Sequence, residues 1–145
     1  MRALFIALSE SRRLRHFAER SAVGRKVSQR FVAGMTVDEA LDATARTNQL
    51  GMSVSIDNLG ENVTNIDEAR ESEKLYHELI DAIVGRRLNA NVSLKLTHMG
   101  LDVDEAVSRR IVSEVVGHAV RAENFVRIDM EGSPYTQKTD RKSVV

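Results

Sequence analysis

The sequence has no cysteine and no tryptophan, and Pro134 is the only proline among its 145 residues. Without cysteine, disulfide bonds and thiolate metal sites are excluded. Aromatic residues make up only 4% of the chain, so we do not expect a stacking platform for nucleic acid. No apolar run approaches the ~20 residues of a membrane-spanning helix. The short run 3–8 is followed by no small-residue cleavage site, and we therefore expect a cytoplasmic protein.

Charge is balanced overall but unevenly distributed along the chain, whose formal net charge is zero. Residues 1–35, the basic arm, carry eight basic and two acidic side chains. Such an arm is either a contact for an anionic membrane surface or nucleic acid, or a solvated helical face that complements an acidic body. The second interpretation is favoured. A peripheral membrane contact stays an alternative, and nucleic acid is not an expected partner.

Three segments alternate between apolar and polar side chains with the period of two that an extended strand imposes. We expect these strands over residues 52–57, 92–97 and 125–131. The central segment reads NVSLKLT from Asn91. Packing alone does not explain why Lys95 stands in the middle of so apolar a strand.

Helical periodicity separates the three strands, which predicts β-α-β crossovers and a parallel sheet. Thr36 and Glu39 form a capping box for one helix, which stops at Gly51. Further helices are expected from Asn65 to near Gly85 and from about residue 102 to 119, and helical stripes also occur within residues 4–31. The fold class is therefore α/β.

The polar strand faces favour a (β/α)8 barrel, because strands of an open sheet covered on both faces tend to be apolar throughout. Asp57, Thr97, Asp129 and Glu131 fall late in their strands, where such a barrel places its chemistry. A complete barrel has eight strands and about 250 residues. We therefore expect the first three β/α units of an incomplete barrel, preceded by N-terminal helices.

This organisation divides the chain into an N-terminal helical region (1–50), a partial barrel (51–135) and a tail (136–145). Residues 136–143 include no apolar side chain, so a helix there would have no face to bury. The ending TDRKSVV can be encoded by a string that looks like a common sequencing adapter. We hypothesise that the reading frame entered adapter sequence after Lys138, with natural truncation and a frameshift as alternatives.

Three motifs in register resemble proline dehydrogenase of the monofunctional bacterial type: DNLGE at 57–61, NVSLKLT at 91–97 and FVRIDMEGS at 125–133. The resemblance extends to about Tyr135 and indicates the N-terminal part of such an enzyme. It implies a distorted β/α barrel that holds FAD. It also implies oxidation of L-proline to pyrroline-5-carboxylate in proline catabolism, with electrons passed to a membrane quinone.

The resemblance also implies roles for individual residues. Lys95 would contact the proline carboxylate, Asp129 would be the active-site aspartate, and Met130 would contact FAD. Glu61 would pair with a substrate-binding arginine that this chain does not contain, and Asp57 would have a supporting role. Because later strands would carry most flavin contacts, we expect the chain alone neither to bind FAD stoichiometrically nor to oxidise proline.

Other functions stay open from the residues themselves. Lys95 could be a Schiff-base nucleophile of a barrel lyase or aldolase, with Asp129 or Glu131 as proton shuttle. It could also be a structural lysine in an ion pair. A non-enzymatic module that binds through the basic arm is a further alternative. The four histidines show no ligand spacing, so no metal site is expected.

Overall fold

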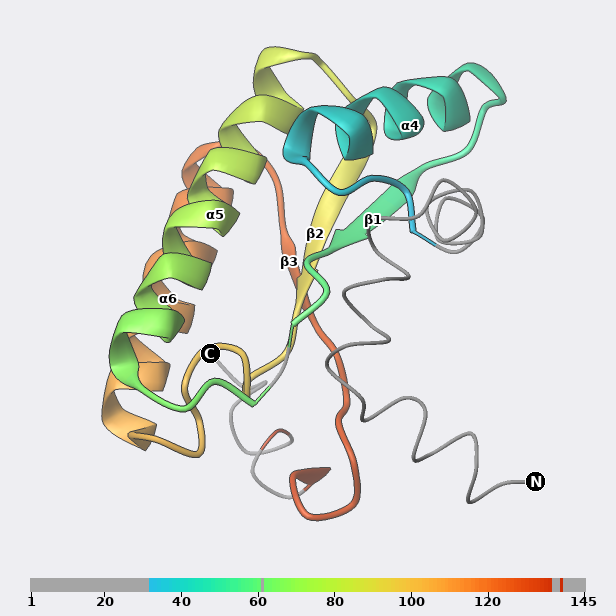
Figure 1. Cartoon of the computed structure of the whole chain (residues 1–145). Coiled ribbons are helices and arrows are strands. Elements are labelled where there is room, and N and C mark those ends of the chain that lie inside the picture. Colours follow the sequence, from blue (N-terminus) through green and yellow to red (C-terminus); the bar gives the residue numbers. More distant parts are fainter. Residues whose placement is uncertain (1–31, 61, 137–138, 140–145) are drawn as a thin grey trace, which may run out of the picture. The chain divides into compact units, whose positions relative to one another are not determined.

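The computed structural model describes residues 32–60, 62–136 and 139. The chain divides into two compact units, Met1–Ala43 and Thr44–Val145. Figure 1 shows the elements in chain order: α4 (Val37–Gln49), β1 (Val54–Asp57), α5 (Ile66–Gly85), β2 (Ala90–Leu94), α6 (Glu105–Arg121) and β3 (Val126–Ile128). The helices predicted within residues 4–31, and nearly all of the basic arm, lie outside the described residues.

In the first unit, the described residues include the start of α4, where the predicted capping interactions are present. The Thr36 hydroxyl accepts a hydrogen bond from the Glu39 N–H at 3.3 Å. The Glu39 carboxylate accepts one from the Met35 N–H at 2.7 Å. The Thr36 bond satisfies a first-turn amide that the helix leaves without an intrahelical partner, whereas Glu39 bonds to Met35, one residue before the cap, and not to a first-turn amide.

In the second unit, β1, β2 and β3 form one parallel sheet in that order, which confirms the predicted pairing. One row of partners across the sheet is apolar and the next is polar: Ile56, Val92 and Val126, then Asp57, Ser93 and Arg127. Because successive side chains of a strand point to opposite faces, the sheet has one apolar face and one polar face.

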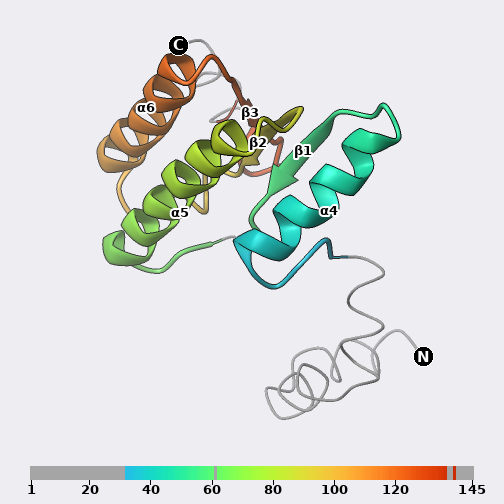
Figure 2. The same cartoon turned by 90° about the horizontal axis from the view of Figure 1, so that it is seen from above.

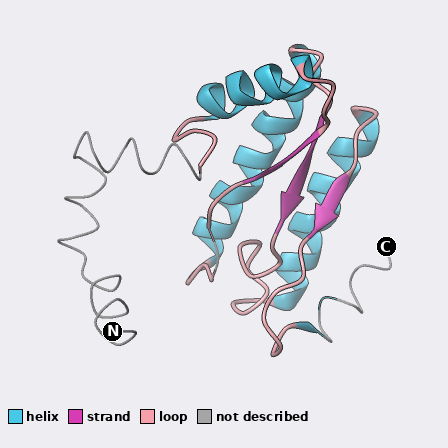
Figure 3. Ribbon diagram, turned by 90° about the vertical axis from the view of Figure 1, so that its right-hand side faces the viewer, coloured by secondary structure: helices cyan, strands magenta, loops and turns pink. Residues whose placement is uncertain are grey.

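Two helices of the second unit, α5 and α6, lie side by side against one face of the sheet (Figures 2 and 3). Both begin at a side-chain cap. Asn65 Oδ1 accepts a hydrogen bond from the Glu68 N–H at 2.9 Å, and Asp104 Oδ1 accepts bonds from the N–H groups of Ala106 and Val107. In the part of the chain that the structure describes, no helix combines the length and apolarity needed to cross a bilayer.

The core of the second unit lies between these helices and the central strand. Its fully buried members come from α5, β2 and α6: Ala69, Tyr76, Ile80, Ile83, Val92, Leu94, Ile111, Val115 and Ala119. Burial of each large aliphatic side chain contributes roughly 1.5–3 kcal/mol relative to exposure. This packing fixes the strands whose ends carry the polar side chains.

The strands are shorter than predicted, and the difference matters most at β2. This strand ends at Leu94, so Lys95 follows the strand instead of standing in its middle, and Thr97 lies in the turn beyond it. The Lys95 carbonyl accepts hydrogen bonds from the N–H groups of His98 and Met99, which bends the backbone away from the sheet. Gly100 completes the turn with a φ of +85°, a conformation that glycine adopts without strain.

Candidate functional site

Polar side chains from all three strand ends meet at the carboxyl-terminal edge of the sheet. We call them the strand-end cluster: Asp57, Ser93, Lys95, Thr97, Asp129 and Glu131. The register places Asp57 beside Ser93, and the Asp129 N–H donates to the Leu94 carbonyl at 2.9 Å. This hydrogen bond continues the pairing of the two strands beyond the end of β3, so Asp129 is held close to the end of β2.

Lys95 and Asp57 form the charged centre of the strand-end cluster. Lys95 Nζ lies 2.5 Å from Asp57 Oδ2, and the two side chains are 22% and 28% exposed. Both groups are therefore partly withdrawn from water, where an ion pair is screened less than on an open surface. The contact gives Lys95 an ion-pair partner within the chain.

Asp129, the predicted catalytic residue, is held by a hydroxyl. Ser93 Oγ donates to Asp129 Oδ1 at 2.5 Å. Ser93 belongs to β2 and Asp129 follows β3, so this bond joins the ends of neighbouring strands. Both aspartates of the cluster are thus oriented by side chains from the central strand or its end.

Thr97 joins the three loops that follow the strands. Its hydroxyl donates to Glu131 Oε1, and its N–H donates to Glu131 Oε2 at 3.1 Å. Its hydroxyl oxygen also accepts a hydrogen bond from the Asn62 N–H at 3.3 Å. The loops after β1, β2 and β3 are therefore connected through one buried side chain.

Tyr76 connects helix α5 to the same cluster, a role that sequence reasoning missed. Its hydroxyl donates to the Ser93 carbonyl at 2.8 Å and lies 3.5 Å from Asp57 Oδ1. Burial, with the nearby Asp57 carboxylate, raises the pKa of Tyr76 well above its usual value. Tyr76 lies within the helix that the sequence predicts from Asn65 to near Gly85, a prediction that gives it no polar role, although a buried tyrosine hydroxyl requires a hydrogen-bond partner.

The two remaining predicted site residues are placed differently. Met130 follows Asp129 directly and is 60% exposed, so its thioether is available to a ligand. Glu61 lies outside the described residues. Among those described, no group of three or more histidine or acidic side chains has the geometry to hold a metal ion.

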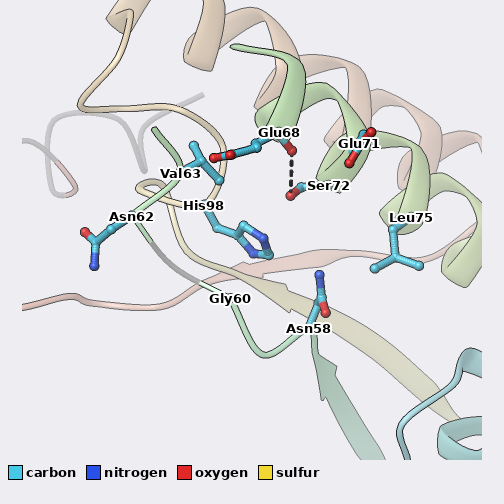
Figure 4. Close-up of a pocket in the computed structure, with 9 residues that line it drawn as sticks. All are labelled: Asn58, Gly60, Asn62, Val63, Glu68, Glu71, Ser72, Leu75 and His98. Atoms are coloured by element: carbon cyan, nitrogen blue, oxygen red, sulfur yellow. Dashed lines mark hydrogen bonds between the residues drawn. The ribbon is translucent and has the colours of Figure 1, made fainter. Parts of the chain in front are cut away.

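A separate pocket of about 380 Å³ lies between the loop after β1 and the first turns of α5 (Figure 4). Its lining includes Asn58, Gly60, Ser72 and His98. A Cβ atom at Gly60 would come within 2.5 Å of the His98 ring, so glycine is required for this close approach. Of the predicted site residues that the structure describes, none is among the residues that line this pocket.

Comparison with known proteins confirms the resemblance that the motifs indicated. The chain is 34% identical over 140 residues to proline dehydrogenase 1 of Bacillus subtilis strain 168, an alignment covering 96% of this chain and 46% of the relative. Proline dehydrogenase 2 of the same strain is 32% identical over 138 residues, covering 95% and 45%. The chain thus spans about half the length of the curated relatives it matches. No family model matches the sequence.

A solved structure supports the fold. The chain superimposes with a TM-score of 0.69 on proline utilization A from Bdellovibrio bacteriovorus, a structure described as inactivated by N-propargylglycine. The match covers 77% of this chain and 14% of the other, at 20% sequence identity. At that identity the likeness establishes a shared α/β arrangement. This chain is therefore related in sequence to proline dehydrogenases and has a fold found in a proline utilization protein.

Proposed function

We propose that this chain supplies one side of the active site of a proline dehydrogenase, an oxidoreductase that converts L-proline to pyrroline-5-carboxylate. The observation that carries the proposal is the arrangement of charge in the strand-end cluster. An ammonium from Lys95 lies beside the carboxylate of Asp57, and Asp129 lies at the end of the adjacent strand. A zwitterionic amino acid presents the complementary pair, one carboxylate and one ammonium.

In this proposal, each predicted residue has a defined task. Lys95 binds the proline carboxylate by charge and hydrogen bonding. Asp129, oriented by Ser93, faces the proline ring and fixes its position. Glu61 has the supporting role that the resemblance gives it, pairing with an arginine supplied by another part of the complete enzyme. The sheet is the first part of a (β/α)8 barrel, in which strand ends of this kind line the active site.

FAD is the cofactor that the proposal requires, and the exposed residues at the end of β3 fit a flavin. Met130 presents an apolar, polarizable side chain next to Asp129, and methionine sulfur makes favourable contacts with aromatic rings. When bound, FAD accepts the hydride removed from proline. The proposed electron acceptor is a quinone, and the basic arm is the proposed region of peripheral contact with the membrane that contains it.

The test replaces the matching segment of Bacillus subtilis proline dehydrogenase 1 with this chain. We expect the chimera to bind FAD and to reduce a dye when L-proline is added. Lys95→Met should raise the KM for proline by about 100-fold, because a charged hydrogen bond to the substrate is lost. Lys74→Met, which removes an exposed lysine of α5, is the matched control and should leave the KM unchanged.

The chain expressed alone gives the complementary measurement. It should purify without stoichiometric FAD and without proline-dependent dye reduction, because the proposed flavin contacts lie mostly on later strands. A yellow preparation of the chain alone that oxidises proline would contradict this expectation. A chimera in which Lys95→Met behaves like Lys74→Met would contradict the proposed role of Lys95.

A further inference from the structure

The Asp57 carboxylate occupies the position on Lys95 that the proposed function gives to a ligand. Asp57 Oδ2 lies 2.5 Å from Lys95 Nζ. A carboxylate of the protein therefore already makes the contact that a substrate carboxylate would make. A ligand carboxylate that makes this same contact must therefore displace Asp57.

The contacts of Asp57 indicate that the pair can open. Its other oxygen lies 3.5 Å from the Tyr76 hydroxyl, the long limit for a hydrogen bond. The single hydroxyl proton of Tyr76 is already donated to the Ser93 carbonyl at 2.8 Å. Asp57 is therefore held more strongly by Lys95 than by Tyr76.

Exposure makes the exchange energetically feasible. The Asp57 side chain is 28% exposed, so water can hydrate the carboxylate once it leaves the lysine. A ligand carboxylate brings the same charge to Lys95, so the ammonium is never left without a counter-ion, which is the costly state of a partly buried charge. The Tyr76 hydroxyl can also rotate its proton toward Asp57.

We propose that Asp57 is the internal counter-ion of Lys95 and that a ligand carboxylate displaces it. The inference rests on the proposed function for the identity of the ligand as an amino acid. Asp57 then also determines specificity, because the displaced carboxylate is available to a ligand ammonium. A zwitterion exchanges one ion pair for two, whereas a simple carboxylate only replaces one partner of Lys95 by another.

The experiment measures how fast Lys95 is acetylated in the full 145-residue chain, with limiting acetic anhydride and peptide mass spectrometry. Lys74, exposed on α5, is the internal reference. We expect Asp57→Asn to speed labelling of Lys95 about fivefold, as loss of a partly exposed ion pair predicts. Asp67→Asn, which removes a charge from the exposed start of α5, should have no effect.

Added ligands test the displacement itself. Cyclopentanecarboxylate should slow the labelling of Lys95 in Asp57→Asn, where the Asp57 carboxylate no longer competes, more than in the unmodified chain. The uncharged cyclopentanecarboxamide should slow it in neither. In the unmodified chain, L-proline should protect Lys95 better than cyclopentanecarboxylate, because its ammonium engages the displaced Asp57.

Three outcomes would overturn the proposal. Equal labelling in Asp57→Asn and the unmodified chain would show that Asp57 does not cover Lys95. Faster labelling without carboxylate protection would show that no ligand takes the place of Asp57. Faster labelling that persists in Asp57→Glu, which keeps the carboxylate, would indicate disturbed folding instead of a lost counter-ion. If the chimera fails to oxidise proline but carboxylate protection is present, the ligand assignment fails and the displacement stands.

Discussion

The strand-end cluster and the contact between α5 and α6 both withdraw ionisable side chains from water. In the cluster, each described carboxylate has a donor: Lys95 for Asp57, Ser93 for Asp129 and Thr97 for Glu131. The helix contact instead joins acids and histidines in what we call the helix seam: Glu73, His77, Asp81, Glu114 and His118. The two regions therefore differ in the groups that surround their ionisable side chains: hydrogen-bond donors in the cluster, and other acids and histidines in the seam.

Glu73 shows the difference most clearly. Its side chain is 8% exposed, and it faces Glu114 of the neighbouring helix. Burial first, and then the Glu114 carboxylate, raise the pKa of Glu73 to about 7. Arg70 lies 3.5 Å away but is 46% exposed, so solvent screens its attraction. Burial and a neighbouring carboxylate thus favour the protonated form of Glu73 up to a pH of about 7.

The pKa of His77 in the seam shifts in the opposite direction. The rings of His77 and His118 meet edge to face at 4.7 Å between centroids, and His118 Nε2 lies 2.7 Å from Asp81 Oδ1. Burial, followed by the neighbouring His118, lowers the pKa of His77. The comparison teaches that donors paired with carboxylates fix the geometry of the cluster, whereas Glu73 and His77 in the seam make stability depend on pH.

The largest effect is expected at Tyr76, which belongs to α5 but reaches the cluster. Tyr76→Ala should lower the free energy of unfolding by about 3–5 kcal/mol, because it empties a fully buried aromatic site. Tyr76→Phe keeps the packing and should cost only about 1 kcal/mol for the lost hydrogen bond. Urea denaturation of both variants measures this. Equal costs would mean that the hydroxyl, not the ring, dominates.

The next effect concerns the pH dependence of the helix seam. The folded state binds the Glu73 proton more tightly than the unfolded state does, so this stabilisation is complete below pH 4.5 and is lost as pH rises through about 7. The full loss is on the order of 3 kcal/mol. Glu73→Gln, which mimics the protonated acid, should therefore be more stable than the unmodified chain at pH 8 and similar to it at pH 4.5.

Denaturation curves at several pH values measure that difference. Protonation of His77, whose pKa is lowered by burial in the fold, destabilises the fold in acid. Glu71→Gln is the matched control, because Glu71 is exposed on the same helix. If both variants gave the same pH profile, the seam would not be the origin of the effect.

A smaller effect is expected within the strand-end cluster. Ser93→Ala removes the donor to Asp129 and should cost about 1.5 kcal/mol, since hydrogen bonds to charged groups are worth more than neutral ones. Hydrogen exchange of the Asp129 amide should also become faster. Ser113→Ala on the exposed side of α6 is the control and should change neither quantity. Unchanged exchange at Asp129 would contradict the proposed orienting role of Ser93.

The smallest effect is expected outside both regions. Arg109 Nη2 and Glu105 Oε1 are 4.0 Å apart on α6, with side chains 67% and 57% exposed. Arg109→Ala should change the free energy of unfolding by less than about 0.5 kcal/mol, because solvent screens such pairs. A larger loss in thermal or urea denaturation would mean that exposed ion pairs contribute as much as those of the cluster.

Much of the fold could be predicted because local sequence specifies it. Period-two alternation identified the strands, and the caps at Thr36 and Asn65 identified the start of their helices, since both signals act within a few residues. The ends of the strands were harder to predict from the sequence. Lys95 continues the alternation of β2 in sequence, yet the backbone hydrogen bonds of the following turn end the strand at Leu94.

The sequence by itself determined that three strands with polar faces would lie in one sheet and that Lys95 would stand among their polar side chains. Only the tertiary structure decided that Asp57 is an ion-pair partner of Lys95, that Tyr76 reaches the same place from a helix, and that Glu73 faces Glu114. The physical reason is range. Periodicity and capping depend on neighbours along the chain, whereas the state of a buried charge depends on groups that folding brings within a few ångströms from distant segments.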